Sequence, residues 1–306
     1  MSNKGYSDTG YKVKRVFFVG AVIILVIAAL LLTVYHSIDH TKNENPTGGS
    51  SVVSSTEDGR LVINDLYAGE LTIPRYDIAK NEYEAAKFIN NNGLVTYDDE
   101  NASLGIDVSS YQEDIDWQQV KDSGIEFVMI RAGYRGATRG KLNEDAKFQV
   151  NYEGAKAAGL KVGVYFFSQA TSVVEAEEEA GYMLQLLQGK ELDYPVVFDW
   201  EFTEVIQNGA NISRTLSVTG EQVTSYARAF CKKIDKGGYD AGVYFNRNLG
   251  YEYYDLEQLD DYDFWLAEYR TVPAFYYDFQ IWQYSDNAKV NGISTPVDIN
   301  ICFKQY

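Results

Sequence analysis

Two carboxylates one residue apart end a short apolar run in the middle of the chain. The run, residues 194–202, reads Tyr-Pro-Val-Val-Phe-Asp-Trp-Glu-Phe, which predicts a strand buried on both faces. Because side chains alternate along a strand, Asp199 and Glu201 share one face, with Cα atoms about 7 Å apart, and Trp200 points the other way. Two carboxylates held this close divide into one acid and one anion near neutral pH, the pairing that glycoside hydrolysis uses.

The elements that position this pair are short strands alternating with amphipathic helices from residue 104 onward. This alternation predicts an α/β domain with a parallel sheet. Helices are expected over residues 173–187 and 220–236, each preceded by a capping box. Little helical periodicity follows residue 245, so the second half of the domain is predicted to be poor in helices. The eight expected strands cover residues 104–108, 127–132, 161–167, 196–200, 241–245, 264–267, 279–284 and 297–303.

Acidic side chains lie near the ends of three of these strands. In a barrel of parallel strands, reactive groups collect at the C-terminal strand ends. Asp107 lies near the end of the first expected strand, Asp199 and Glu201 end the fourth, and Asp298 lies early in the eighth. The first and eighth strands of a closed barrel are neighbours, and the fourth lies across the mouth. We therefore expect the four carboxylates to face one cavity.

Aromatic side chains follow the other strand ends. The chain has 25 tyrosines and 4 tryptophans, and their flat apolar faces suit the C–H faces of sugar rings. Together with the carboxylates they predict a carbohydrate cleft. The candidates are Tyr134, Tyr165, Tyr244, Trp265, Tyr269 and Trp282.

Composition excludes several other kinds of site. A net charge of -17 over 306 residues argues against a nucleic acid partner, because phosphate binding needs a basic surface. The only histidines, His36 and His40, lie outside the expected domain, which excludes a histidine-based triad and an ordinary histidine-liganded zinc site there. No metal or other cofactor is expected. Cys231 and Cys302 either form a disulfide or remain two buried thiols.

The N-terminal part of the chain predicts a membrane anchor. Residues 1–15 are polar and end in basic side chains, and the twenty residues from Val16 to Tyr35 carry no charge. As a helix they measure about 30 Å, the thickness of the hydrocarbon core of a bilayer. Basic residues on the N-terminal side indicate a cytoplasmic tail. We therefore expect a single-pass protein of the cell membrane that contacts the bilayer through Val16 to Tyr35, with a monomeric extracellular C-terminal domain.

Two segments separate the anchor from the α/β domain. Residues 36–60 are rich in Asn, Thr, Ser and Gly, a composition typical of a flexible linker. Residues 61–103 have a mixed pattern with a short helix expected over residues 82–89, and they form either a stalk or a strap packed on the domain. Residues 104–306 then make up the α/β domain.

Motifs spread in unbroken order over residues 104–306 resemble glycoside hydrolase family 25, the Chalaropsis-type lysozymes. The resemblance implies an irregular TIM-like barrel of eight strands with about five helices. It also implies an N-acetylmuramidase that cleaves the β-1,4 bond between N-acetylmuramic acid and N-acetylglucosamine in peptidoglycan with retention. The motifs are Gly105-Ile-Asp-Val-Ser-Ser-Tyr-Gln112, Ile115-Asp-Trp117, Gly124-Ile125, residues 127–133, Asp145 with Phe148 and Asn151, Gly163-Val-Tyr165, Asp199-Trp-Glu201, Gly242-Val-Tyr244, Trp265-Leu-Ala267, Gln283-Tyr284, and Val297-Asp298 with Asn300.

The resemblance also implies roles for the acidic residues. Glu201 matches the general acid of the family. Asp199 is expected to stabilise charge at the anomeric carbon, either as a nucleophile or by orienting the acetamido group of the substrate. Asp107 and Asp298 match two further acids, with positioning and electrostatic roles. Residues expected to bind substrate are Tyr134, Tyr165, Tyr244, Trp265, Tyr269 and Gln283.

Two positions depart from the family pattern, and two other functions compete with the first. Phe166 stands where many members have histidine, and Glu268 adds a negative charge; both bear on substrate affinity more than on the reaction. One rival is a catalytically silent protein that binds or scaffolds peptidoglycan with the same barrel. The other is a barrel hydrolase of a different polysaccharide.

Overall fold

The computed structural model describes residues 50–306. The predicted cytoplasmic tail, the membrane helix over Val16 to Tyr35 and most of the predicted linker lie outside this range. Among the described residues no helix is both long and apolar enough to span a bilayer. Thr203–Ser213 belong to a separate compact unit. By themselves these residues form a small hairpin of β11 (Ile206–Gln207) and β12 (Ala210–Asn211).

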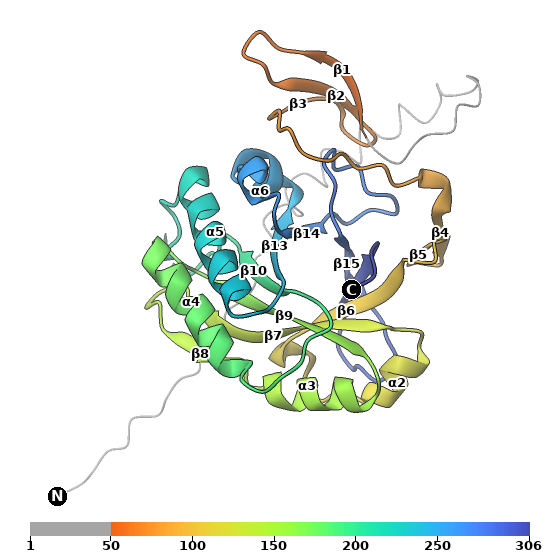
Figure 1. Ribbon diagram of the computed structural model, residues 1–306, viewed down its shortest axis with the longest axis vertical. Helices are drawn as coiled ribbons and strands as arrows, with labels where there is room; N and C mark the ends of the chain where they lie inside the picture. Colours follow the sequence, from red (N-terminus) through yellow and green to blue (C-terminus); the bar gives the residue numbers. More distant parts are fainter. Residues whose placement is uncertain (1–49) are drawn as a thin grey trace, which may run out of the picture. The chain divides into compact units, whose positions relative to one another are not determined.

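Eight strands close into a barrel, as predicted (Figure 1). They are β6 (Ser103–Val108), β7 (Phe127–Arg135), β9 (Lys161–Ser168), β10 (Val196–Trp200), β13 (Ala241–Asn246), β14 (Asp263–Ala267), β15 (Ile281–Ala288) and β16 (Val297–Cys302). Their order is β6-β16-β15-β14-β13-β10-β9-β7, and the pairing of β6 with β7 closes the ring. A short strand, β8 (Leu142–Glu144), extends β7 outside the barrel.

The direction of the last strand differs from the prediction. The other seven barrel strands run parallel, but β16 is antiparallel to both of its neighbours, β15 and β6. Only the eight residues 289–296 connect β15 to β16. A parallel connection needs a crossover of a dozen residues or more, so this short loop forces the chain to reverse.

Five α-helices accompany the described strands, in agreement with the expected number. They are α2 (Trp117–Asp122), α3 (Phe148–Ala157), α4 (Val173–Leu186), α5 (Gly220–Lys236) and α6 (Arg247–Glu252). The Ser172 side chain caps α4, but the capping box predicted there does not form, because the Glu175 side chain accepts from the backbone N–H of Thr171. Thr219 with Gln222 forms the predicted capping box of α5. After β13 only α6 and the single 3-10 turn Leu256–Leu259 are helical, which confirms a helix-poor second half.

Alternation along the strands divides the core into two layers. On β10, Val197 faces the barrel interior, and Phe198 faces outward, where its ring lies 5.2 Å from that of Phe230 on α5. The helices α4 and α5 lie side by side against this outer face (Figure 1). The interior is tightly packed, because a Cβ atom on Gly105 would lie 2.3 Å from the ring of Phe127. Side chains thus fill the barrel below its mouth.

The two cysteines lie in different layers of the core. Cys231 on α5 packs outside the barrel and Cys302 on β16 packs inside it. Both are buried and free. Of the two alternatives left open by the sequence, the structure has two unpaired thiols.

An antiparallel sheet precedes the barrel and corrects the predicted linker boundary. It consists of β1 (Ser51–Ser55), β2 (Leu61–Asp65) and β3 (Gly69–Ile73). The linker was expected to extend to residue 60, but β1 and its turn to β2 lie before that point. β1 itself is exposed at every residue, whereas the apolar side chains of β2, including Ile63, are buried and contribute to the core.

The following segment is held to the barrel by tyrosine hydroxyl groups. Tyr76 donates to the carbonyl of Tyr254 at 2.9 Å, and Tyr83 donates to that of Phe279 at 2.5 Å. The short helix expected over residues 82–89 is wrong. Instead, one 3-10 turn, Ala85–Lys87, leads into a hairpin of β4 (Phe88–Asn91) and β5 (Leu94–Tyr97), so helical periodicity there did not outweigh strand pairing.

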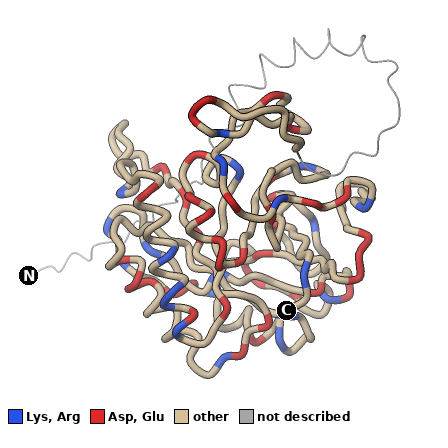
Figure 2. Tube along the Cα trace, turned by 45° about the horizontal axis from the view of Figure 1, so that its top comes forward, with Lys and Arg blue, Asp and Glu red and all other residues tan. Residues whose placement is uncertain are grey.

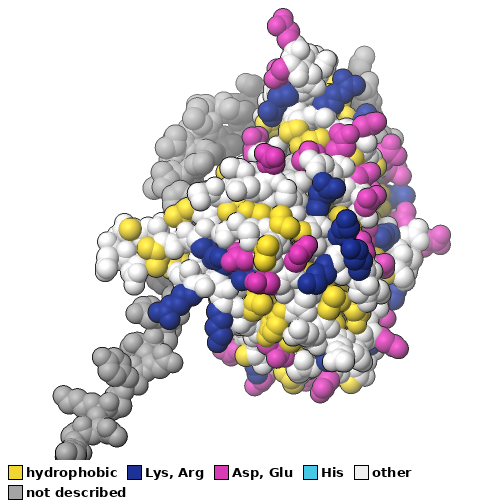
Figure 3. Space-filling model, turned by 60° about the vertical axis from the view of Figure 1, so that its left-hand side comes forward, with side chains coloured by type: hydrophobic (Ala, Val, Ile, Leu, Met, Phe, Trp, Pro, Cys, Tyr) yellow, Lys and Arg dark blue, Asp and Glu magenta, His cyan; other side chains and the backbone are white. Residues whose placement is uncertain are grey.

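Acidic residues are distributed over the whole described trace (Figure 2). On the face shown in Figure 3, basic and acidic side chains lie beside one another among apolar ones. The surface therefore offers no extended basic area on this face, in keeping with the net charge of -17.

Candidate active site

The barrel brings the predicted acids to one mouth. Asp298 pairs in register with Asp107, because antiparallel β16 begins at the edge where β6 ends. On β10, Asp199 is 4% exposed and lies beside Tyr244 of β13. Glu201 follows the last residue of β10 and is partly exposed. The reversal of β16 therefore explains why an acid early in the eighth strand joins acids late in the first and fourth.

The pKa values of two tyrosines indicate that the four carboxylates lie close to the same side chains. Burial, followed by the negative charge of Glu201 and more weakly those of Asp199 and Asp107, raises the pKa of Tyr244 well above its ordinary value. Burial and then the charge of Asp298 raise the pKa of Tyr269. Both phenols therefore keep their protons at neutral pH and act as hydrogen-bond donors.

A buried amide network fixes Asp107. Its Oδ2 accepts from Gln283 Nε2 at 2.8 Å and from Asn300 Nδ2 at 2.9 Å. The Oδ1 of Asn300 in turn accepts from Trp265 Nε1 at 2.8 Å. Asn300 is fully buried and Asp107 is 6% exposed, so these bonds form away from bulk water, where an unpaired partner is costly.

Gln283 joins this network to the tyrosines. Its Oε1 accepts from Tyr244 at 3.1 Å and from Tyr269 at 3.0 Å, while its amide nitrogen donates to Asp107. The side chain is 4% exposed. Gln283 thus connects an exposed tyrosine of the rim to a carboxylate inside the mouth.

Aromatic rings line the mouth below and beside the acids. The ring of Trp265 lies 5.9 Å from that of Tyr165 and 5.0 Å from that of Tyr244, both edge to face. All three are at most 7% exposed, whereas Tyr269 is 38% exposed. The aromatic candidate Trp282 is wrong, because it faces outward, fully buried, and its indole donates to the carbonyl of Glu268.

Tyr134 lies on a second part of the rim, around a buried arginine. The guanidinium carbon of Arg131 lies 5.3 Å from the centre of the Tyr134 ring and 5.4 Å from that of Tyr111. Arg131 also pairs with Asp145 at 2.6 Å. The register of β7 shifts between Arg131 and Gly133, a bulge of the kind that redirects side chains near active sites. The rings of Tyr134 and Tyr111 are therefore held by the guanidinium group of Arg131, whose positive charge is neutralised by Asp145.

The backbone that carries Glu201 is bound by the segment after β9. Gln169 Nε2 donates to the carbonyl of Glu201 at 2.7 Å and to that of Ser168 at 2.8 Å. Trp200 is fully buried outside the barrel, as alternation predicts, and its indole donates to the carbonyl of Ala170 at 3.0 Å. The acid pair consequently rests on a strand end fixed from two sides.

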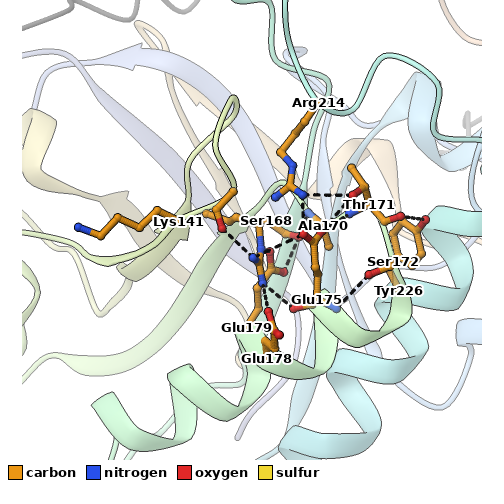
Figure 4. A network of polar contacts seen from close by, with 12 residues as sticks. Lys141, Ser168, Ala170, Thr171, Ser172, Glu175, Glu178, Glu179, Arg214 and Tyr226 are labelled. Carbon is orange, nitrogen blue, oxygen red and sulfur yellow. Dashed lines mark hydrogen bonds and ion pairs between the residues drawn. The ribbon is translucent and has the colours of Figure 1, made fainter.

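An ionic network holds that segment in place (Figure 4). Glu179 of α4 accepts from Ser168 and from Arg135, both at 2.6 Å. Glu175 pairs with Arg214 at 2.5 Å and also accepts from Thr171. These contacts tie the end of β9 to α4, so the same network supports the residues that bind the Glu201 backbone.

Glu179 predicts a pH dependence of stability. Burial raises its pKa to about 7 from a usual 4.5, although Ser168 and Arg135 act in the opposite direction. The folded protein therefore binds this proton more tightly than the unfolded chain does. We expect the free energy of unfolding to fall by about 3 kcal/mol from this group as the pH rises from about 4.5 to 7. Urea denaturation of wild type and Glu179→Gln across this range measures the difference.

Glu178→Gln is the matched control for that measurement. Glu178 lies on the same helix and contacts the same Arg135 at 3.2 Å, but its side chain is 55% exposed. Its substitution should leave the pH dependence of wild type unchanged. An equal slope in wild type and Glu179→Gln would contradict the expectation.

Asn300 predicts a large loss of stability. Asn300→Ala leaves the Trp265 indole without its acceptor and removes one of the donors to Asp107. Because these groups are buried, we expect the free energy of unfolding to decrease by about 2–3 kcal/mol. Urea denaturation followed by circular dichroism checks the value. Asn287→Ala, an exposed position on β15, should change it little, and equal effects at the two positions would argue against the role of the network.

Two buried polar residues of the site, Asn300 and Arg131, were not among the candidates from sequence. Signals for both were present. Asn300 alternates with Asp298 along one strand and so shares its face. Arg131 is a charge inside an otherwise apolar run, which requires a partner, and Asp145 follows fourteen residues later.

The two departures from the family pattern do not add charge or bulk to the mouth. Phe166 is fully buried on the outer face of β9, where it packs against Phe230. Glu268 is 7% exposed; it pairs with Arg247 at 2.7 Å and accepts from the backbone N–H groups of Ala274 and Phe275. Within residues 50–306, no group of three or more His, Cys, Asp or Glu side chains has the arrangement of a metal site.

Known proteins resemble this chain in sequence. It is 32% identical over 200 residues to the autolytic lysozyme of Clostridium acetobutylicum, a match that covers 64% of this chain and 54% of that protein. It is 27% identical over 209 residues to Lysozyme M1 of Streptomyces globisporus, covering 64% of this chain and 66% of the relative. The chain thus spans about half the length of the first relative and two thirds of the second.

Solved structures share the fold at lower identity. The autolysin LytC from Streptococcus pneumoniae, in complex with a synthetic peptidoglycan ligand, matches with a TM-score of 0.58 and 21% identity over 80% of this chain and 56% of its own. A family 25 glycosyl hydrolase from Bacillus anthracis matches with a TM-score of 0.53 and 22% identity over 70% of this chain and 95% of its own. The family model for glycosyl hydrolases family 25 matches residues 106–293, more than half of the chain, and this protein therefore belongs to that family.

Proposed function

We propose that this protein is a peptidoglycan hydrolase, an N-acetylmuramidase that cleaves the β-1,4 bond between N-acetylmuramic acid and N-acetylglucosamine with retention, in cell-wall remodelling. The observation that carries the proposal is the placement of Asp199 and Glu201 at one strand end, in a barrel mouth that also holds Asp107 and Asp298. Aromatic rings line the same mouth. The names of the autolytic lysozyme and of Lysozyme M1 give the reaction class.

The acids take different roles in this mechanism. Glu201, partly exposed beyond the strand, donates its proton to the leaving glycosidic oxygen. Asp199, nearly buried beside it, stabilises positive charge at the anomeric carbon, as a nucleophile or through the acetamido group of the substrate. Asp107 and Asp298 add negative charge and order the mouth. Asp107 is itself oriented by Gln283 and Asn300.

The aromatic candidates divide into two groups in this scheme. Tyr134 and Tyr269, at the rim, contact sugar rings directly. The nearly buried Tyr165, Tyr244 and Trp265 form the floor beneath the reacting sugar and keep water away from Asp199. Gln283 holds Tyr244 and Tyr269 in their orientations.

The chain organisation completes the proposal. Residues 16–35 anchor the protein in the cell membrane with residues 1–15 in the cytoplasm, and the barrel, residues 104–306, lies outside as a monomer. The uncharged twenty-residue run supports this arrangement. Cell fractionation with protease treatment of intact cells tests it: the full-length chain should remain with the membrane and lose its barrel to external protease. Recovery in the cytosol would refute the anchor.

Digestion of purified peptidoglycan by the full-length chain in mild detergent tests the reaction. Mass spectrometry of the soluble products after borohydride reduction should find reduced muramic acid at the fragment ends. Reduced glucosamine ends would identify a glucosaminidase instead. Binding to the wall without soluble products would favour the silent scaffold, and release of fragments from chitin in preference to peptidoglycan would favour a hydrolase of another polysaccharide.

A further inference from the structure

An exposed tyrosine and an exposed arginine from distant parts of the chain stack beside the mouth. Tyr67 lies in the turn between β2 and β3 and is 45% exposed. The guanidinium carbon of Arg270, in the loop after β14, lies 4.9 Å from the centre of its ring. Arg270 directly follows Tyr269, the rim tyrosine that donates to Gln283. The stacked pair therefore adjoins the rim of the active site.

The turn that carries Tyr67 is fixed by buried charge. The Oδ1 of Asp65 accepts from the backbone N–H groups of Tyr67 at 2.9 Å and Ala68 at 2.7 Å. Asp65 is 3% exposed, and its Oδ2 pairs with Arg247. The Tyr67 hydroxyl donates to the carbonyl of Val272 at 2.9 Å. The N-terminal sheet thus presents this ring in one defined position on the barrel.

The loop that carries Arg270 is fixed by contacts of Glu268, the residue just before Tyr269. Arg247, which pairs with Asp65, also pairs with Glu268. Glu268 in turn accepts from the backbone N–H groups of Ala274 and Phe275, which closes the loop upon itself. One arginine therefore links the β2–β3 turn to the loop that contains both Tyr269 and Arg270.

Arg270 has unused binding capacity in an acidic protein. Within the described part of the chain its side chain forms no ion pair and one hydrogen bond, from Nη1 to the carbonyl of Tyr269 at 3.3 Å. The whole chain carries a net charge of -17, and four carboxylates lie in the adjoining mouth. A guanidinium stacked on a ring keeps most of its N–H donors outward, in the fork geometry that suits a carboxylate.

We propose that Tyr67 and Arg270 form an accessory subsite that binds a carboxylate of the peptide attached to the glycan strand. The substrate identity rests on the proposed function. The sugars of the strand would occupy the aromatic mouth, while the peptide, which carries the free carboxylates, extends to the rim. Arg270 pairs with the carboxylate, and Tyr67 orients the guanidinium and packs on the peptide chain. The N-terminal sheet, which precedes residues 106–293, thereby contributes directly to substrate selection.

The test compares binding to soluble glycan strands with and without their peptides. Full-length Glu201→Gln, which retains the mouth, is titrated with both polymers by calorimetry, alone and combined with Arg270→Gln. We expect Arg270→Gln to weaken binding of the peptide-bearing strands about two- to fivefold, within the range for an exposed ion pair, and to leave the peptide-free strands unaffected. Tyr67→Phe, which keeps the ring and removes its hydrogen bond, should give a smaller change in the same direction.

Arg75→Gln is the matched control, because Arg75 is an exposed arginine of the same N-terminal segment that lines a different cavity with Tyr76 and Glu257. It should change neither affinity. The subsite would be overturned if Arg270→Gln weakened binding of both polymers equally. It would also be overturned if Glu201→Gln alone bound the peptide-bearing strands no more tightly than the peptide-free strands. If the subsite exists but the protein is not a muramidase, the result is different: the peptide-bearing strands bind more tightly than the peptide-free strands, and wild type cleaves neither.

Discussion

Glu201→Gln is expected to lower the rate of peptidoglycan hydrolysis at least about a hundredfold. The amide keeps the size of the carboxyl group but has no proton of suitable acidity for the leaving oxygen. Glu201 follows the end of β10, and its backbone is held by Gln169, so the substitution should not disturb the strand. The rate of release of reducing ends, measured at saturating substrate, checks the prediction.

A matched substitution separates loss of the acid from loss of a surface charge. Glu153→Gln removes an exposed carboxylate on α3, and it should leave the rate unchanged. Unaltered circular dichroism and retained affinity for glycan strands would show that Glu201→Gln is folded. A rate within about threefold of wild type would assign the acid to another carboxylate of the mouth.

Much of the barrel follows from local sequence. The strand at residues 196–200 and the helix at residues 220–236 occur at the predicted bounds, because each combines a regular apolar pattern with an unambiguous start. Strand alternation also placed Asp199 and Trp200 on opposite faces. The shared mouth of Asp107, Asp199 and Glu201 could be inferred from their places at parallel strand ends, whereas Asp298 joins them only because β16 is reversed.

Other features depend on contacts that sequence patterns do not specify. Asp65 and Arg247 are 182 residues apart, and nothing local indicates that they pair. The outward orientation of the Trp282 side chain depends on the strand register. An error of one residue in the predicted register places a side chain on the opposite face of the strand.

The reversal of β16 was not evident either, because the strands predicted over residues 279–284 and 297–303 leave twelve residues between them, enough for a parallel crossover. The observed β15 extends to Ala288 and leaves only residues 289–296. The position at which β15 ends therefore decides the direction of the last strand, and the predicted bounds missed it.

Asp199→Ala is expected to lower the hydrolysis rate about a hundredfold or more, because it removes the buried negative charge nearest to Glu201 along β10. Asn300 and Gln283 contact Asp107 rather than Asp199, so the fixed network should remain and the variant should fold. The rate of release of reducing ends gives the size of the effect. Asp193→Ala, an acid just before the same strand, is the control and should retain activity.

Added azide distinguishes the two roles open to Asp199. If Asp199 is the nucleophile, the cavity left by alanine admits azide, which attacks the anomeric carbon from the same face; activity then recovers and a glycosyl azide of inverted configuration forms. If Asp199 orients the acetamido group, that group remains the nucleophile and azide restores nothing. A thiazoline analogue of the cyclised acetamido intermediate should then inhibit wild type strongly and Asp199→Ala weakly. Asp199 is 4% exposed at the mouth of a packed barrel, so azide can reach its position only from the side where the substrate binds. Recovery of the hydrolysis rate would therefore indicate that azide attacks the anomeric carbon.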